Sequence, residues 1–286
     1  MNSNTFTSLF AVRYLCLAVL AVLQVICMPA MAWDFSSTDQ TTEHSVQLRA
    51  GADFTKKFNN GIRLHAAEDL RFDVYNSLSG ASFNKSYTTL SFAYAPVKYF
   101  KVDAGYTLKI MGNKDWADVN KWMRHRAFFS VTGAVKAGRW RFSLRERALC
   151  EVRMGDIDLY TAENLYEHNR ADWYLRSKVE VQYSSMSKPL KPYLWVELVN
   201  TLNANELQQK YKDNNPTNQG HQYIRRVRTA LGVTWKLDKR NALNFYYRFN
   251  YGYDRDVNVK PNKQTILLTE ETSFQHAIGV NYEFGW

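Results

Sequence analysis

Apolar and polar residues alternate along most of the chain with a period of two, which is the period of a β-strand. Between residues 61 and 75, for example, Ile62, Leu64 and Ala66 alternate with Arg63 and His65. The same alternation predicts strands over 44–58, 61–75, 83–95, 99–110, 124–137, 139–153, 170–184, 191–202, 221–237, 241–253 and 271–286. These segments are long for a soluble protein and fit the ~9–11 residues with which a tilted strand crosses a membrane.

The connections between these segments alternate in length. Short turns are expected at 56–61, 95–98, 136–139, 184–191 and 237–241, and longer polar loops at 76–82, 111–123, 154–169, 203–220 and 254–270. Bacterial outer-membrane barrels place short turns in the periplasm and long loops outside. Under that rule the strand at 44–58 runs toward the periplasm, so one more strand must precede it, near 33–37. The sequence therefore predicts an all-β fold, a transmembrane antiparallel up-and-down β-barrel of twelve strands, with ten as the alternative.

The first residues have the features of an export signal. Arg13 is the only charged residue before position 33 and is followed by an apolar run over 14–26. Ala30 and Ala32 then supply the small residues that a signal peptidase requires. The apolar run is short for a membrane-spanning helix. We therefore expect a signal peptide over 1–32 and an outer-membrane barrel domain over 33–286.

The last predicted strand ends on an aromatic residue. One of its faces carries Phe274, Ile278, Val280, Tyr282, Phe284 and Trp286. This arrangement resembles the C-terminal signature that the barrel-assembly machinery recognises, so Tyr282, Phe284 and Trp286 are predicted to be the assembly signal. Interfacial aromatic girdles are expected from Trp140, Trp173, Tyr183, Tyr223, Trp235 and Tyr251. The expected location is the bacterial outer membrane, with its lipids and the assembly machinery as partners.

Two stretches near the start of the predicted barrel resemble a known family. They are Ser45-Val-Gln-Leu-Arg-Ala-Gly-Ala-Asp53 and Gly61-Ile-Arg-Leu-His-Ala-Ala-Glu-Asp-Leu-Arg-Phe72. They are similar to the DUF2490 family of uncharacterised outer-membrane barrels. The resemblance implies a barrel over most of the exported chain and assigns no activity.

Composition and spacing exclude several classes of function. The chain has 37 Lys and Arg against 27 Asp and Glu, a net charge of +10. These charges are dispersed over the strands of an exported protein, so a nucleic-acid partner is not expected. Cys16 and Cys27 leave with the signal peptide, and Cys150 alone cannot form an intramolecular disulfide. The sequence has no metal-ligand spacing, glycine-rich phosphate loop or paired thiols, so no cofactor is expected.

The polar faces of the strands are predicted to line the lumen. Their densest basic cluster is Arg124, Arg126, Arg141, Arg145, Arg147, Arg226 and Arg228, with Arg124 and Arg126 expected to face Arg141, Arg145 and Arg147 across a hairpin. Arg176, Arg248 and Glu197 also fall on this face. Guanidinium groups bind carboxylates and phosphates through two parallel hydrogen bonds. Two interpretations remain open, a closed lumen braced by arginine–carboxylate pairs and a narrow channel that attracts small anions.

Two alternative functions are considered. A soluble periplasmic lipocalin-like barrel would invert the two faces and bury the apolar residues around an apolar ligand. A membrane-barrel lipid hydrolase would need a serine and a histidine on the lipid face, where His125 and His276 fall without a serine two positions on. No enzyme activity is therefore expected. Glu68 and Glu146 also fall on the lipid face, which indicates either a β-bulge that turns them inward or a protein contact.

Overall fold

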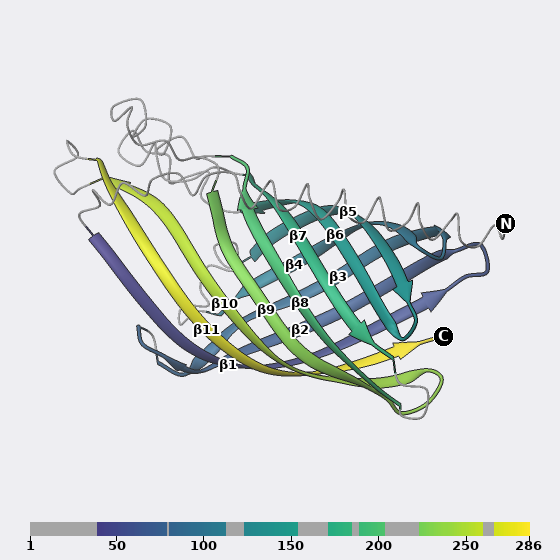
Figure 1. The fold of residues 1–286 in the computed structure, drawn as a ribbon. Coiled ribbons are helices and arrows are strands. Elements are labelled where there is room, and N and C mark those ends of the chain that lie inside the picture. The colour runs from purple at the N-terminus through teal and green to yellow at the C-terminus, as the bar shows by residue number, and fades with distance from the viewer. Residues whose placement is uncertain are drawn as a thin grey trace.

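The computed structural model describes residues 39–78, 80–112, 123–153, 171–184, 189–203, 223–259 and 266–286. These residues form one closed β-barrel (Figure 1). Its strands are β1 (Asp39–Lys57), β2 (Ile62–Asn76), β3 (Ser82–Val97), β4 (Phe100–Met111), β5 (Met123–Ala137), β6 (Trp140–Arg153), β7 (Ala171–Tyr183), β8 (Leu190–Thr201), β9 (Tyr223–Lys236), β10 (Asn241–Val259) and β11 (Ile266–Gly285). Neighbours in the chain are neighbours in the barrel, so the predicted up-and-down order and all eleven predicted segments are confirmed.

The ring closes with eleven strands, so the prediction of twelve, and the alternative of ten, are wrong for the described residues. β1 pairs with β2 on one side and with β11 on the other, from Asp39 opposite Thr269 to Thr55 opposite Gly285. Because β1 then has hydrogen-bonding partners on both edges, the barrel closes without a further strand. An odd number of strands makes the β1–β11 pair parallel. The strand expected near 33–37 and the signal peptide lie outside the described residues.

The longest hairpin extends into a predicted loop. β10 continues to Val259 and β11 begins at Ile266, so most of the loop expected at 254–270 is a strand pair. Its register includes Arg255 opposite Glu270. The polar composition suggested a loop, but the backbone hydrogen bonds of an antiparallel pair do not depend on which side chains the strands carry.

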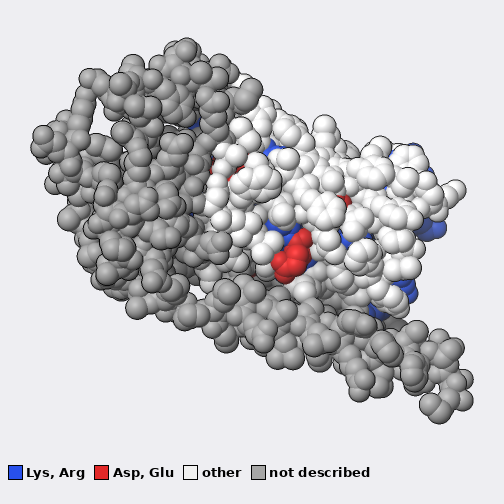
Figure 2. Space-filling model, turned by 90° about the horizontal axis from the view of Figure 1, so that it is seen from above, with Lys and Arg blue, Asp and Glu red and all other residues white. Residues whose placement is uncertain are grey.

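Most large apolar side chains of the strands face outward, and most of their charged side chains face inward. Leu231 is 61% exposed and Ile278 is 60% exposed, whereas Gln47 and Glu197 on the inner wall are at most 2% exposed. The described surface in Figure 2 is accordingly mostly uncharged, with Lys and Arg visible at its right-hand rim and a small charged group near its centre. This is the opposite of the apolar interior that a soluble lipocalin-like barrel requires, and that alternative is wrong.

The interior also contains two apolar features. A buried cluster on four successive strands, β5 to β8, consists of Phe128, Leu149, Tyr174 and Val199. In addition, three inward aromatic rings lie against the glycine directly opposite on the next strand, Phe128 on Gly105, Tyr193 on Gly232 and Tyr246 on Gly279. A side chain at any of these glycines would overlap the ring, so each glycine gives an aromatic residue room inside a narrow barrel.

None of the described segments forms a helix that is long and apolar enough to cross a membrane.

Candidate functional site

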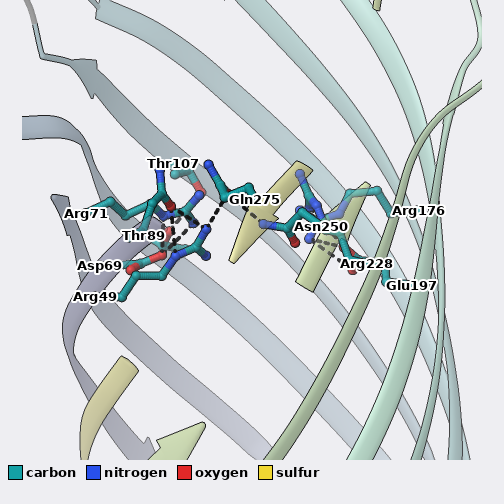
Figure 3. Close-up of polar contacts among 11 residues, drawn as sticks. Arg49, Asp69, Arg71, Thr89, Thr107, Arg176, Glu197, Arg228, Asn250 and Gln275 are labelled. Atoms are coloured by element: carbon teal, nitrogen blue, oxygen red, sulfur yellow. Dashed lines mark hydrogen bonds and ion pairs between the residues drawn. The ribbon is translucent and has the colours of Figure 1, made fainter. Parts of the chain in front are cut away.

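A chain of polar contacts follows the inner wall and joins strands that are distant in sequence (Figure 3). The Arg49 guanidinium donates to Gln275 Oε1 over 3.0 Å, and Asn250 Nδ2 donates to the same oxygen over 2.6 Å. On the other side of β2, Thr89 of β3 and Thr107 of β4 are joined by a hydrogen bond of 2.9 Å. Such contacts between neighbouring strands hold the inward side chains in fixed positions.

The centre of the site is Glu197 on β8, whose side chain is 2% exposed. Arg145 donates to its carboxylate over 2.9 Å, and Arg228 over 3.0 Å. Arg176 Nη2 contacts both oxygens, at 2.8 and 3.0 Å. Three guanidinium groups therefore share one carboxylate, and the group keeps an excess of positive charge. We call these four residues the Glu197 cluster.

Arg147 extends this positive region onto the neighbouring strands. Its Nε donates to Ser130 Oγ over 2.7 Å, and its Nη2 lies 3.3 Å from Asp103 Oδ2. The guanidinium stacks 4.0 Å above the Phe128 ring. Lys101 Nζ lies 3.1 Å from the other oxygen of Asp103, so this carboxylate also serves two cations.

Arg248 on β10 differs from the other inward arginines. Its guanidinium carbon lies 5.0 Å from the Trp195 ring centroid and 5.4 Å from that of Tyr246. Among the described residues no carboxylate lies within ion-pair distance of Arg248, and its direct contacts are with these aromatic rings. Lys178 stacks on Trp195 as well, at 4.7 Å.

A separate ion-pair network lies closer to the long loops. Glu151 accepts a hydrogen bond from Arg126 and lies 3.3 Å from Lys109 Nζ. Arg126 and Arg71 both stack on the Tyr87 ring, at 5.1 and 4.1 Å. This network pairs its charges more evenly than the Glu197 cluster does.

The predicted basic cluster is therefore divided among several places. The β5–β6 register puts Arg126 opposite Glu151 and Arg124 opposite Arg153, whereas Arg145 lies opposite Thr132 and Arg147 opposite Ser130. The expected facing of Arg124 and Arg126 with Arg141, Arg145 and Arg147 is wrong, because antiparallel strands bring the start of β5 to the end of β6. Arg124 donates to Met123 O over 3.0 Å, and Arg226 contacts Asp254 at 3.2 Å. The Glu197 cluster includes Arg145 and Arg228, and Arg147 lies beside it. Arg141 lines the smaller of two cavities.

Two cavities adjoin these residues in the half of the lumen nearer the short turns. The larger, about 570 Å³, is lined by eight basic and six acidic residues, including Arg145, Arg147, Arg176 and Arg248. We call it the main cavity. The smaller, about 240 Å³, has six basic residues, Arg63, Lys98, Lys101, Arg141, Arg145 and Lys178, and Glu180 as its acidic residue.

The sequence alone did not single out Arg176 and Arg248, because only the register brings β7 and β10 to the same height as β6.

The outer face carries a few polar groups. His125 is hydrogen bonded to Tyr106 OH at 2.5 Å, and His276 to Tyr247 OH at 2.7 Å. The described His, Cys, Asp and Glu residues form no group of three that could hold a metal ion.

Glu68 and Glu146 face outward, as their positions in the sequence predicted. Thr88 Oγ1 donates to Glu68 and Ser177 Oγ donates to Glu146, each over 2.6 Å. The bulge that would have turned them inward is absent from the register around both residues.

The predicted assembly signal lies at the closing seam. Trp286 lies against Lys56, whose Nζ is 5.3 Å from the ring centroid, and against Phe284 at 5.2 Å. Tyr282 OH donates to Asn241 Oδ1 on β10. Two of the predicted girdle residues, Trp140 and Tyr183, are in contact, with ring centroids 4.9 Å apart and ring planes tilted by 58°.

Comparison with known proteins gives one matching family, and solved structures similar to this chain include two outer-membrane barrels. A family model described as a protein of unknown function, DUF2490, matches residues 50–260. No curated protein matches the chain. A NanC porin structure is 14% identical with a TM-score of 0.43, covering 83% of this chain and 98% of that one. The outer-membrane expressed OmpT of Vibrio cholerae is 12% identical with a TM-score of 0.34, covering 69% of this chain and 56% of that one.

Proposed function

Since the chain belongs to the DUF2490 family, whose function is unknown, we propose that it is an outer-membrane β-barrel whose arginine-rich lumen is a narrow passage selective for anions. The membrane part of the proposal rests on the two faces of the barrel wall. Large apolar residues such as Leu90, Leu194 and Ile278 are more than half exposed on the outside. A closed barrel satisfies its own backbone hydrogen bonds, so such a wall is stable in lipid.

The anion part rests on a single observation, the excess of cations in the Glu197 cluster. Three guanidinium groups contact one carboxylate, and the two adjoining cavities have more basic than acidic residues in their walls. A narrow lumen with walls of low dielectric constant concentrates the field of such an excess. Anions are therefore attracted into the passage and small cations are repelled.

The test is a measurement of ion selectivity. The refolded protein is inserted in a planar bilayer under a salt gradient, and the reversal potential is expected to have the sign of an anion-selective pore. Replacement of Arg145 and Arg147 by Gln removes two charges from the lumen and is expected to shift the reversal potential toward cations. The matched control replaces Lys56 and Arg139 by Gln and is expected to leave the reversal potential unchanged, because Lys56 lies over the Trp286 ring and Arg139 donates to Tyr183 OH, both outside the lumen.

Two results would contradict the proposal. A folded wild-type barrel that conducts no current would favour the second candidate, a closed barrel braced by ion pairs such as Arg126–Glu151 and Arg176–Glu197. Mature protein that is released with the periplasm, without detergent, would contradict the outer-membrane location. Heat-modifiable gel mobility checks folding in each experiment.

A further inference from the structure

Five of the eight basic residues that line the main cavity come from three strands. Arg145 and Arg147 come from β6, Arg176 and Lys178 from β7, and Arg248 from β10. Arg228 on β9 joins them through Glu197. Figure 3 shows Arg176 and Arg228 directed at the same carboxylate. The six residues Arg145, Arg147, Arg176, Lys178, Arg228 and Arg248 are called the cavity cations below.

The carboxylates that contact the cavity cations are too few to neutralise them. Arg145, Arg176 and Arg228 share Glu197, Arg147 contacts Asp103, and Lys178 contacts Glu180 at 2.6 Å. By direct contact, six positive charges meet three negative ones, and the whole wall of the main cavity, with eight basic and six acidic residues, also keeps a positive excess. Like charges held this close in a poorly solvated site repel each other, so an anion of more than one charge would stabilise the arrangement.

Several donors of the cavity cations also lack acceptors. The Nε atoms of Arg145, Arg176 and Arg248 are buried and have no hydrogen-bond partner among the described residues. Arg248 in addition makes no ion pair there and is held by Trp195 and Tyr246. Buried donors without acceptors are costly, and the attraction of an anion in the cavity to these guanidinium groups offsets that cost.

We propose that the cavity cations bind a phosphate group, as a binding site within the anion passage; this inference rests on the proposed function. A phosphate carries about two negative charges near neutral pH and has several strong acceptor oxygens. Its tetrahedral oxygens accept from guanidinium groups that approach from different strands, whereas a carboxylate offers two oxygens in one plane. The main cavity, about 570 Å³, has room for a phosphate attached to a small organic group as well as for the free ion.

The test measures binding of inorganic phosphate, glycerol phosphate and acetate to the refolded full-length barrel by titration calorimetry. Saturable binding is expected for inorganic phosphate or glycerol phosphate, and none for acetate at the same concentration. Arg248→Gln is expected to weaken binding about tenfold or more, as the loss of a charge-assisted contact implies. Arg248 is chosen because its removal leaves no contacting carboxylate without a partner. Arg248→Lys keeps the charge but loses the planar fork, so an intermediate affinity is expected, and Lys56→Gln is the control with wild-type affinity.

The outcomes separate this site from the proposed passage. An anion-selective conductance with no saturable phosphate binding overturns the phosphate site and leaves the passage intact. Phosphate binding to a barrel that conducts nothing supports the site and contradicts the passage. Binding of glycerol phosphate alone assigns the site to phosphorylated organic solutes, and binding of the free ion alone assigns it to inorganic phosphate. Equal affinity for phosphate and acetate, or unchanged phosphate affinity in a folded Arg248→Gln barrel, overturns the site.

Discussion

At the scale of single residues, one buried carboxylate in the interior serves several arginine side chains. Glu197 satisfies three guanidinium groups at once, so its removal leaves all three without their common counter-ion. The loss of one of these arginines, by contrast, leaves Glu197 with two partners. Residues that belong to the same cluster are therefore expected to differ widely in their effect on stability.

Replacement of Glu197 by Gln is expected to lower the free energy of unfolding by roughly 3–5 kcal/mol, the usual effect of breaking a buried ion pair from one side. Arg228→Gln is expected to cost about 1 kcal/mol, since the carboxylate keeps Arg145 and Arg176. Urea unfolding of the barrel in lipid vesicles, followed by tryptophan fluorescence, compares the two variants. Equal losses would contradict the sharing of Glu197.

The glycines beneath the aromatic rings lead to a second prediction. A methyl group at Gly279 would overlap the Tyr246 ring, whereas Gly133 has no atom near its added methyl group. Gly279→Ala is therefore expected to destabilise the barrel by about 1–3 kcal/mol, the usual cost of overpacking. Gly133→Ala is the matched control and is expected to be close to neutral. The same urea titration applies, and a neutral Gly279→Ala would show that the ring moves without cost.

At the scale of strands and hairpins, the sequence predicted what depends on local pattern. The period of two located all eleven strands and their inward faces, because one face of each strand is apolar. It did not predict the register between hairpin partners, and so it placed Arg124 and Arg126 beside Arg145 and Arg147. It also missed the extension of β10 and β11, since polar hairpins and polar loops have the same composition. The Glu197 cluster depends on both register and closure, which a single strand does not encode.

The turn between β9 and β10 shows an electrostatic contribution at the same scale. Asp238 accepts hydrogen bonds from the backbone N–H of Arg240 at 2.6 Å and of Asn241 at 2.7 Å. Asn241 Nδ2 donates to its second oxygen at 2.6 Å. Together these hydrogen bonds lower the pKa of Asp238 below its usual value of 3.8, the side-chain bond from Asn241 being the largest cause.

A carboxyl whose pKa is lower in the folded than in the unfolded protein stabilises the fold at any pH above its unfolded pKa. This contribution is lost as the pH falls through the folded pKa. The amides of the β9–β10 turn are therefore expected to open more often below pH 3.8 than above it. Asp238→Asn is expected to remove this pH dependence. Hydrogen exchange over residues 237–241 at several pH values measures the effect, and the β3–β4 turn serves as an internal control. Identical pH profiles of wild type and variant would contradict the prediction.

At the scale of the whole molecule, the fold depends on one seam. β1 and β11 are the most distant strands in sequence and lie side by side in the ring (Figure 1). Their pairing is parallel, and it ends where Trp286 O accepts from Lys57 N–H at 2.9 Å and Trp286 N–H donates to Thr55 O at 3.0 Å. The last residues of the chain thus complete the closure, and the same residues were predicted to form the assembly signal.

Deletion of Phe284–Trp286 is therefore expected to block membrane insertion while leaving export intact. The truncated chain loses the contacts of Trp286 with Thr55 and Lys57 and that of Gly285 N–H with Arg240 O, at 2.8 Å, so both edges of β11 lose their final hydrogen bonds. Cell fractionation is expected to show a processed, protease-sensitive periplasmic species in place of a heat-modifiable membrane protein. Trp286→Phe keeps a terminal aromatic side chain and every backbone contact, and is expected to assemble as wild type. Trp286→Gln keeps the backbone contacts but loses the ring. Assembly of this variant at wild-type level would show that barrel closure, and not the aromatic side chain, is required. Normal membrane levels of the deletion variant would contradict both roles.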